Sequence, residues 1–333
     1  MSGDFINYNS DKPHAIGAGL LSAILSVGGY VLSSWMLTEN LSNVVFVVGF
    51  YLTISLGVFF LGIAIGKHAK TRVEYCQPNW DFQPVQLKLD EAKSLSWRHL
   101  RQYPRLTVNG HFMLFYIPVL LILFLIGLPT YASIEIPTAV SFVVPVVTIF
   151  LPVLFLSSTL LGFLATSNGA SEDFSLPLMR ETVWLAKKQL NVPGVTYLRV
   201  VLDKAEQGDY TVYKNPRVIV RLDGIEKAAY VESWSEEKGA LRQLMCRLFP
   251  EDSKDDILWW WLSVDRYFRK FAGNDDEGYY VKNPIQSAVQ ELGVKDVRLV
   301  TMNAVAIILL EWQRIHGENR KLKGILSNLG VPG

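Results

Sequence analysis

The chain has 333 residues, half of them apolar and only 19% charged, with a formal net charge of +1. Its mean hydropathy is positive, which places it outside the ordinary range of soluble proteins. A near-neutral chain also lacks the basic excess of most nucleic-acid-binding proteins.

Four segments contain no Asp, Glu, Lys or Arg: 15–38, 40–66, 112–134 and 136–171. Each is long enough to cross about 30 Å of hydrocarbon as a helix, which takes roughly 20 apolar residues. The first exceeds the apolar region of a signal peptide, about 7–15 residues, so we expect it to be retained. The sequence predicts a membrane α-helical protein with four transmembrane helices, in hairpins at 15–66 and 112–166.

Loop charges predict the orientation of these spans. The connection 67–111 holds eight Lys and Arg residues against four acidic residues, whereas the two short connections carry only Glu39 and Glu135. Basic loops stay on the cytoplasmic side. We therefore expect a cytosolic N-terminus at 1–14, a cytosolic basic connection at 67–111, a cytosolic domain at 171–333, and a location in a bacterial inner membrane.

Small residues recur in the first two spans. Ala18, Ser22 and Ser26 follow at four-residue spacing, and Gly62 and Gly66 end the second span. Because small residues let helix backbones approach closely in lipid, we predict that these two spans pack on each other through them.

No ionisable residue lies deep in any span, which disfavours a pump or an ion-coupled transporter. A pore lined by hydroxyl groups of the fourth span remains an alternative. Prolines inside the third and fourth spans predict kinks, which are ordinary in membrane helices and can also serve gating.

The basic connection contains a stretch, 87–103, with helical apolar spacing beside basic residues. Such a helix could lie on anionic lipid, with Arg98, Arg101 and Arg105 at the membrane surface. The same charges serve equally well as a topology signal, and the two interpretations stay open.

The domain 171–333 is predicted to be α+β with an antiparallel meander. A helix at 175–190 precedes strands at 195–202, 210–222 and 225–234, with Asp223-Gly224 as a hairpin turn. Pro216 demotes the second strand to an edge or a bulge. From Ser235 the pattern turns helical, with a helix from Ser253 to Phe271. A strand at 279–282, a helix at 284–292, a strand at 297–300 and a helix at 303–316 complete the domain.

Residues for catalysis or metal binding are scarce in this domain. It has one histidine, His316, and one cysteine, Cys246, too few for a zinc site or a Ser-His-Asp arrangement. From Glu172 onward, 23 basic residues balance 23 acidic ones, so we expect no nucleic-acid binding, and we expect no cofactor. Carboxylates such as Glu236, Glu237 and Asp255 are explained as helix caps rather than as an enzyme site.

The run Trp259-Trp260-Trp261 suggests a partner interface. On the predicted helix, Trp259 aligns with Arg266 and Lys270 on the polar face, and Trp260 flanks the apolar face. Aromatic and arginine side chains are typical of interfaces, so Trp259, Trp260, Arg266 and Lys270 form the predicted partner interface. Coverage of Trp259 by another part of the domain remains an alternative.

These observations favour a non-enzymatic inner-membrane component of a multiprotein assembly, such as a secretion, conjugation or defence apparatus. Its expected partners are the lipid bilayer and either further copies of the chain, in a homo-oligomer, or other membrane subunits. The alternative is an oligomeric sensor-effector, whose cytosolic domain binds a ligand and whose spans perturb or gate the membrane.

Overall fold

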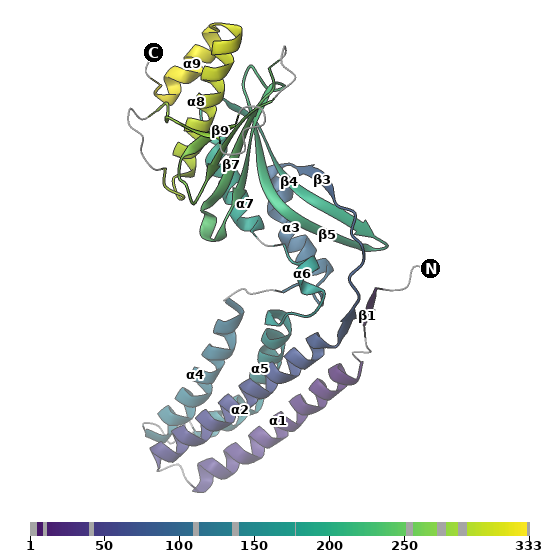
Figure 1. Ribbon diagram of the computed structural model, residues 1–333. Helices are drawn as coiled ribbons and strands as arrows, with labels where there is room; N and C mark the ends of the chain where they lie inside the picture. Colours follow the sequence, from purple (N-terminus) through teal and green to yellow (C-terminus); the bar gives the residue numbers. More distant parts are fainter. Residues whose placement is uncertain are drawn as a thin grey trace. The chain divides into compact units, whose positions relative to one another are not determined.

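A computed structural model describes residues 5–8, 12–39, 43–108, 113–134, 140–176, 178–250, 256–271, 278–285 and 292–331 (Figure 1). The chain divides into two units. The helical unit comprises Met1–Asn79 and Leu100–Ser175, and the sheet unit comprises Trp80–His99 and Leu176–Gly333.

The helical unit contains the four predicted apolar helices. They are α1 (Lys12–Glu39), α2 (Val44–Thr71), α4 (Met113–Ile134) and α5 (Val140–Ala165). By length and composition, each is able to cross a membrane. A short antiparallel ladder joins β1 (Ile6–Tyr8) to β2 (Val73–Tyr75), and α6 (Ser171–Phe174) closes the unit. The prediction of four long apolar helices is confirmed.

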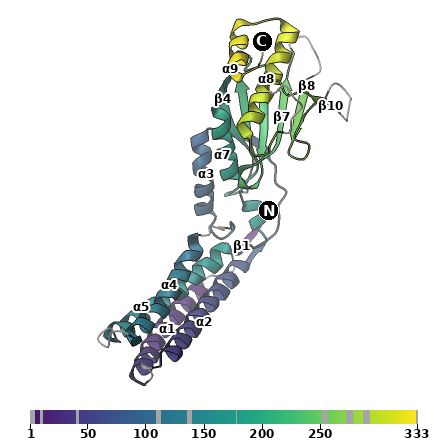
Figure 2. The ribbon, with the colours of Figure 1, turned by 90° about the vertical axis from the view of Figure 1, so that its left-hand side faces the viewer.

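Helix α5 is the common packing partner in this unit (Figure 2). Among the described residues, α1 packs mainly on α5, and α2 packs on α5 and α4. The prediction that the first two spans pack chiefly on each other is therefore wrong. Of the small residues that suggested it, Ser26, Gly62 and Gly66 instead contact α5.

Two glycines of α2 allow its close approach to α5. A Cβ added at Gly62 would lie 2.7 Å from the Cβ of Ser158, and one at Gly66 would overlap the carbonyl oxygen of Thr159. Gly162 of α5 is constrained in the same way by the backbone of Ile63. Without these glycines the two backbones could not come as close in lipid.

Helix α1 contacts α5 through a serine. The hydroxyl of Ser26 donates a hydrogen bond to the carbonyl oxygen of Thr148, at 3.1 Å. In an unbroken helix that carbonyl would accept the N–H of residue 152, but Pro152 has none. Ala18 and Ser22 are half-buried on α1.

The sheet unit is built on an eight-stranded antiparallel sheet of order β10-β9-β8-β7-β6-β5-β4-β3. The strands are β3 (Gln83–Leu87), β4 (Val195–Gln207), β5 (Tyr210–Leu222), β6 (Ala229–Ser235), β7 (Leu241–Leu248), β8 (Ile257–Leu262), β9 (Phe268–Phe271) and β10 (Tyr279–Val281). The predicted antiparallel meander is confirmed and extends to seven consecutive strands.

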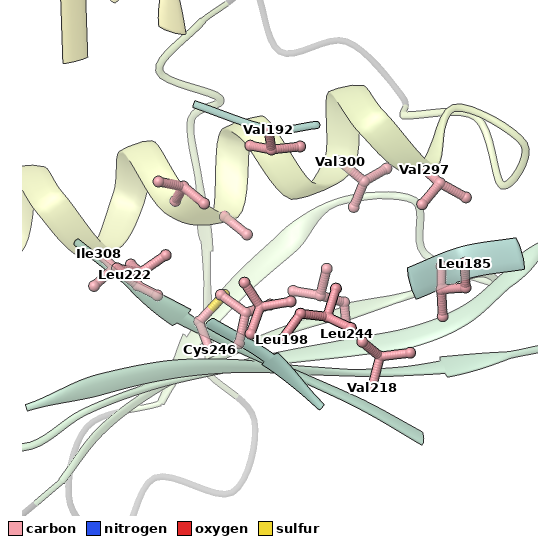
Figure 3. Packing of buried hydrophobic residues seen from close by; sticks show 14 of the residues in the cluster. Leu185, Val192, Leu198, Val218, Leu222, Leu244, Cys246, Val297, Val300 and Ile308 are labelled. Carbon is pink, nitrogen blue, oxygen red and sulfur yellow. The ribbon is translucent and has the colours of Figure 1, made fainter. Parts of the chain in front are cut away.

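Helices cover one face of this sheet. They are α3 (Leu89–Gln102), α7 (Met179–Leu190), α8 (Val297–His316) and α9 (Arg320–Leu329), and all four contribute to one apolar core. Figure 3 shows α8 above the strands, with Val300 and Ile308 directed toward side chains such as Leu244 and Cys246.

The edge strand β3 and helix α3 come from the connection between the second and third spans. Leu87, Leu89 and Leu95 lie in or against the core of the sheet unit. The expected amphipathic helix therefore forms, but protein rather than lipid covers its apolar side. Arg98, Arg101 and Arg105 are exposed, and their place at a membrane surface stays a prediction.

Several predicted elements are wrong. Residues 257–271 form the hairpin of β8 and β9 rather than a helix, and the consecutive apolar side chains of 257–262 point alternately to the two faces of the sheet. Residues 241–248 form strand β7, residues 297–300 open helix α8 rather than a strand, and α9 was not predicted. Ser253 and most of 284–292 lie outside the described residues.

Pro216 produces a bulge in β5 rather than an edge strand. Val201 of β4 pairs with Arg217, whereas Asp203 pairs with Lys214, so Asn215 and Pro216 together oppose a single residue. Asn215 has φ 50°, and this left-handed backbone conformation accommodates the extra residue of β5. The bulge lies where pairing between β5 and β6 begins, at Arg217 and Trp234.

Candidate functional site

The predicted interface residues lie on opposite sides of the sheet. Trp259 points into the helix-covered core and is 1% exposed, so the alternative in which it is covered is confirmed. Lys270 pairs with Trp259 across β8 and β9, and its ammonium lies 5.3 Å from the ring centroid. Trp260 points to the other face, opposite Arg269. Arg266 lies in the turn between the strands, with φ 59°.

The face that carries Trp260 is the strongest candidate site. Three cross-strand rows on β5 to β9 define it, and we call it the open face. The rows are Ile219, Glu232, Met245, Trp260 and Arg269; Arg217, Trp234, Gln243 and Leu262; and Arg221, Tyr230, Arg247, Leu258 and Phe271. All four described helices of the unit pack on the opposite face.

Acidic partners hold the arginines of the open face in place. Arg217 contacts Asp203 at 2.9 Å and Glu232 at 2.6 Å, and its side chain is only 16% exposed. The bulge supplies a third member, because the amide of Asn215 donates to Asp203 at 2.9 Å. This part of the face is a rigid polar network rather than a set of free charges.

Two further arginines of the open face lie against aromatic rings. Arg269 contacts Asp265 at 3.0 Å and lies 4.6 Å from the ring centroid of Tyr280. Arg247 lies 6.0 Å from the ring centroids of Tyr230 and Phe249. Such stacking fixes guanidinium groups at little entropic cost and leaves flat, partly apolar surfaces.

Glu232 is the most buried carboxylate on the open face. Burial raises the pKa of Glu232 above its ordinary value, although the charge and hydrogen bond of Arg217 act against that rise. Arg217 therefore offsets only part of the cost of burying the ionised carboxylate of Glu232.

Among the residues of this unit that the structure describes, those suited to covalent chemistry do not cluster. Cys246 lies in the core, where burial raises the pKa of its thiol far above the usual range. His316 stacks on Trp312, with ring centroids 3.8 Å apart. Within the described ranges, no group of three His, Cys, Asp or Glu side chains could hold a metal ion.

Sequence reasoning found Trp260 but missed the rest of the open face. The missing signal was a polar or aromatic residue at every second position of β6, and at two of three such positions on β5 and β7, which only a strand assignment reveals. In comparisons with known proteins, the chain matches no family model, no curated protein and no solved structure.

Proposed function

We propose that this chain is a non-enzymatic, membrane-anchored subunit of a homo-oligomeric assembly, in which two sheet units join through their open faces. The observation that supports this is the open face itself: partly exposed aromatic and arginine side chains on a rigid sheet, with the four described α-helices of the unit on the other side. Aromatic residues and arginine are enriched in protein interfaces.

Charge argues for a protein partner rather than a nucleic acid. Three of the four arginines of the open face form ion pairs, Arg217 with Glu232 and Asp203, Arg247 with Asp256 and Arg269 with Asp265. Arg221 donates instead to the carbonyl oxygen of Glu226. A surface that neutralises phosphates would leave its cations without acidic partners. The open face is instead near neutral, as expected for a surface that buries itself against protein.

The arrangement of these charges favours a second copy of the same chain. A two-fold axis parallel to the strands, between β7 and β8, would place Glu232 of one copy opposite Arg269 of the other. The same axis would place Met245 opposite Trp260, since these residues share one cross-strand row. A two-fold interface requires such self-complementarity.

The four apolar helices would confine the copies to one membrane, which raises their effective concentration and lets a modest interface suffice. In this proposal both termini and the sheet unit lie on the cytoplasmic side of a bacterial inner membrane. Cys76 tests the orientation because it is an exposed thiol and the other cysteine is buried. A membrane-impermeant maleimide should label Cys76 in inverted vesicles and leave it unlabelled in intact spheroplasts.

The oligomer is tested by light scattering of the full chain in mild detergent. The wild-type chain should have the molar mass of a dimer or a larger oligomer, and the Trp260→Glu variant that of a monomer. Trp184→Glu is the control, since Trp184 is 39% exposed but lies on α7, on the helix-covered side. A monomeric wild type, or an unchanged mass for Trp260→Glu, would contradict the proposal.

Charge reversal sharpens this test. Glu232→Arg and Arg269→Glu should each weaken the dimer, and the double variant should regain part of the loss if the two residues face each other. Folding of each variant is checked by circular dichroism. If the double variant is weaker than both single variants, the proposed two-fold axis is wrong.

A further inference from the structure

A second feature of the sheet unit lies on its helix-covered side. A pocket of about 270 Å³ opens between β8, β9 and β10 on one side and α8 on the other. Its apolar walls include Val281, Ile307 and Leu310, and the buried ring of Trp259 lies beneath them. The volume falls just below the roughly 300–1,000 Å³ of ordinary ligand sites, so any occupant is small.

A buried ion-pair network forms one wall. Lys270 of β9 and Arg314 of α8 both bond the same oxygen of Glu311, Oε1, at 2.8 and 2.5 Å. The side chains of Lys270 and Glu311 are 13% and 14% exposed. Burial alone would raise the pKa of Glu311, but the hydrogen bonds and charges of the two cations outweigh it and lower that pKa. Glu311 is thus a fixed anion.

Among the described residues that line the pocket, positive charge nevertheless exceeds negative charge. Three cations, Lys270, Lys282 and Arg314, line it against one carboxylate, Glu311. The side chain of Arg314 bonds Glu311 but is still 69% exposed, and Lys282 is exposed. Within the described residues, no carboxylate forms an ion pair with Lys282. The unbalanced cations therefore lie at the mouth, above apolar walls.

We propose that this pocket binds a small anion with a flat apolar body, an aromatic compound that carries one carboxylate or phosphate group. The apolar body lies between Val281, Ile307 and Leu310, and Tyr279 closes over it from the rim. The anionic group is held at the mouth by Lys282 and Arg314. Charge-assisted hydrogen bonds of this kind are the strong ones, and Arg314 can offer two parallel donors.

This site is separate from the proposed dimer contact, because Trp259 and Trp260 point to opposite faces of β8. Ligand binding and oligomerisation can accordingly be measured independently. The pocket also lies between strand β10 at the sheet edge and α8, so an occupant would join these two elements beside the Lys270–Glu311 pair, which links β9 to α8.

The test is calorimetric titration of the full chain in detergent micelles with two anions and their neutral counterparts. Indole-3-acetate is compared with indole-3-acetamide, and adenosine 5′-monophosphate with adenosine, so that the carboxylate and phosphate versions are separated. At least one anion should bind saturably, and its neutral counterpart at least about tenfold more weakly, as expected for the loss of one charge-assisted bond.

Variants then locate the binding. Lys282→Gln and Arg314→Gln should each raise the Kd of the bound anion about tenfold, whereas Arg298→Gln, on the same helix α8 but outside the pocket, should leave it unchanged. The proposal is overturned if neither anion binds saturably, if the neutral compounds bind as tightly, or if the Lys282→Gln/Arg314→Gln double variant retains wild-type affinity.

Discussion

The hydroxyl of Ser26 in α1 bonds the carbonyl oxygen of Thr148, the carbonyl that Pro152 leaves without a backbone donor in α5. A carbonyl without a donor in hydrocarbon costs free energy, so the serine from a neighbouring helix repairs the defect. Interhelical hydrogen bonds of this type contribute about 0.6 kcal/mol on average and up to about 1.7 kcal/mol.

We therefore predict that Ser26→Ala lowers the free energy of unfolding of the helical unit by about 1 kcal/mol. In a Pro152→Ala background the loss should nearly vanish, because residue 152 regains an N–H for Thr148. Thermal unfolding in detergent of the four variants of this double-mutant cycle measures the coupling. Equal losses in both backgrounds would show that Ser26 acts independently of the proline.

Gly66 and Gly57 of α2 offer a matched pair. Gly66→Ala should destabilise the packing of α2 on α5 by about 1–3 kcal/mol, because the added methyl group overlaps the backbone of Thr159. No atom lies within 4 Å of a Cβ at Gly57, so Gly57→Ala should be neutral or stabilise the helix by about 0.5–1 kcal/mol. The melting temperatures of the two variants in the same detergent test this difference: that of Gly66→Ala should fall, and that of Gly57→Ala should stay equal or rise.

Glu232 predicts an unusual pH dependence. Its folded pKa is raised above the ordinary value of 4.5, so its contribution to stability is fully present below that value and is lost as pH rises through the folded pKa. Glu232→Gln does not titrate there, and Arg217 keeps Asp203 as its partner.

The variant should therefore gain stability relative to wild type as pH rises from about 4 to about 7, by about 1.4 kcal/mol for each unit of pKa shift. Urea unfolding followed by tryptophan fluorescence at several pH values measures this difference. A difference that stays constant, or that grows toward acid, would contradict the burial argument.

Strand β3 and helix α3 should be needed for the sheet unit to fold as an isolated fragment. A fragment of residues 171–333 lacks both, so it exposes the unpaired edge of β4 and the core surface that Ala92 and Leu95 cover. It should aggregate or exchange its amide protons rapidly in β4. Joining residues 80–99 to that fragment through a flexible linker should restore protection, as hydrogen exchange would show. Equal protection in both fragments would mean that β3 and α3 are dispensable.

The membrane helices were predictable because an uncharged apolar stretch of sufficient length has few other folded outcomes. Their packing partners were not, because Gly62 and Gly66 indicate close approach without indicating to which helix. The hairpin of β8 and β9 was missed for a different reason. Residues 257–271 place apolar side chains at helical spacing and also at every second position within 257–262, and pattern alone does not distinguish the two.

The candidate site shows the same limit. Trp260 and Lys270 stood out by composition, but assigning them to one surface required the period of the element, and a strand places Trp259 and Trp260 on opposite faces. Local pattern did not bring Arg217, Glu232 and Trp234 together on one surface. Their proximity arises from pairing between strands, which neighbouring residues in the chain do not encode.

The pairing of β3 with β4 has a consequence for the path of the chain through a bilayer. Residues 83–87 precede α4, residues 195–207 follow α5, and they meet as adjacent strands in one sheet. Two strands can hydrogen-bond only in the same compartment, so the chain between them must traverse the bilayer an even number of times. The β3–β4 pairing thus forms only when the second hairpin is correctly inserted, and this requirement is independent of loop charge.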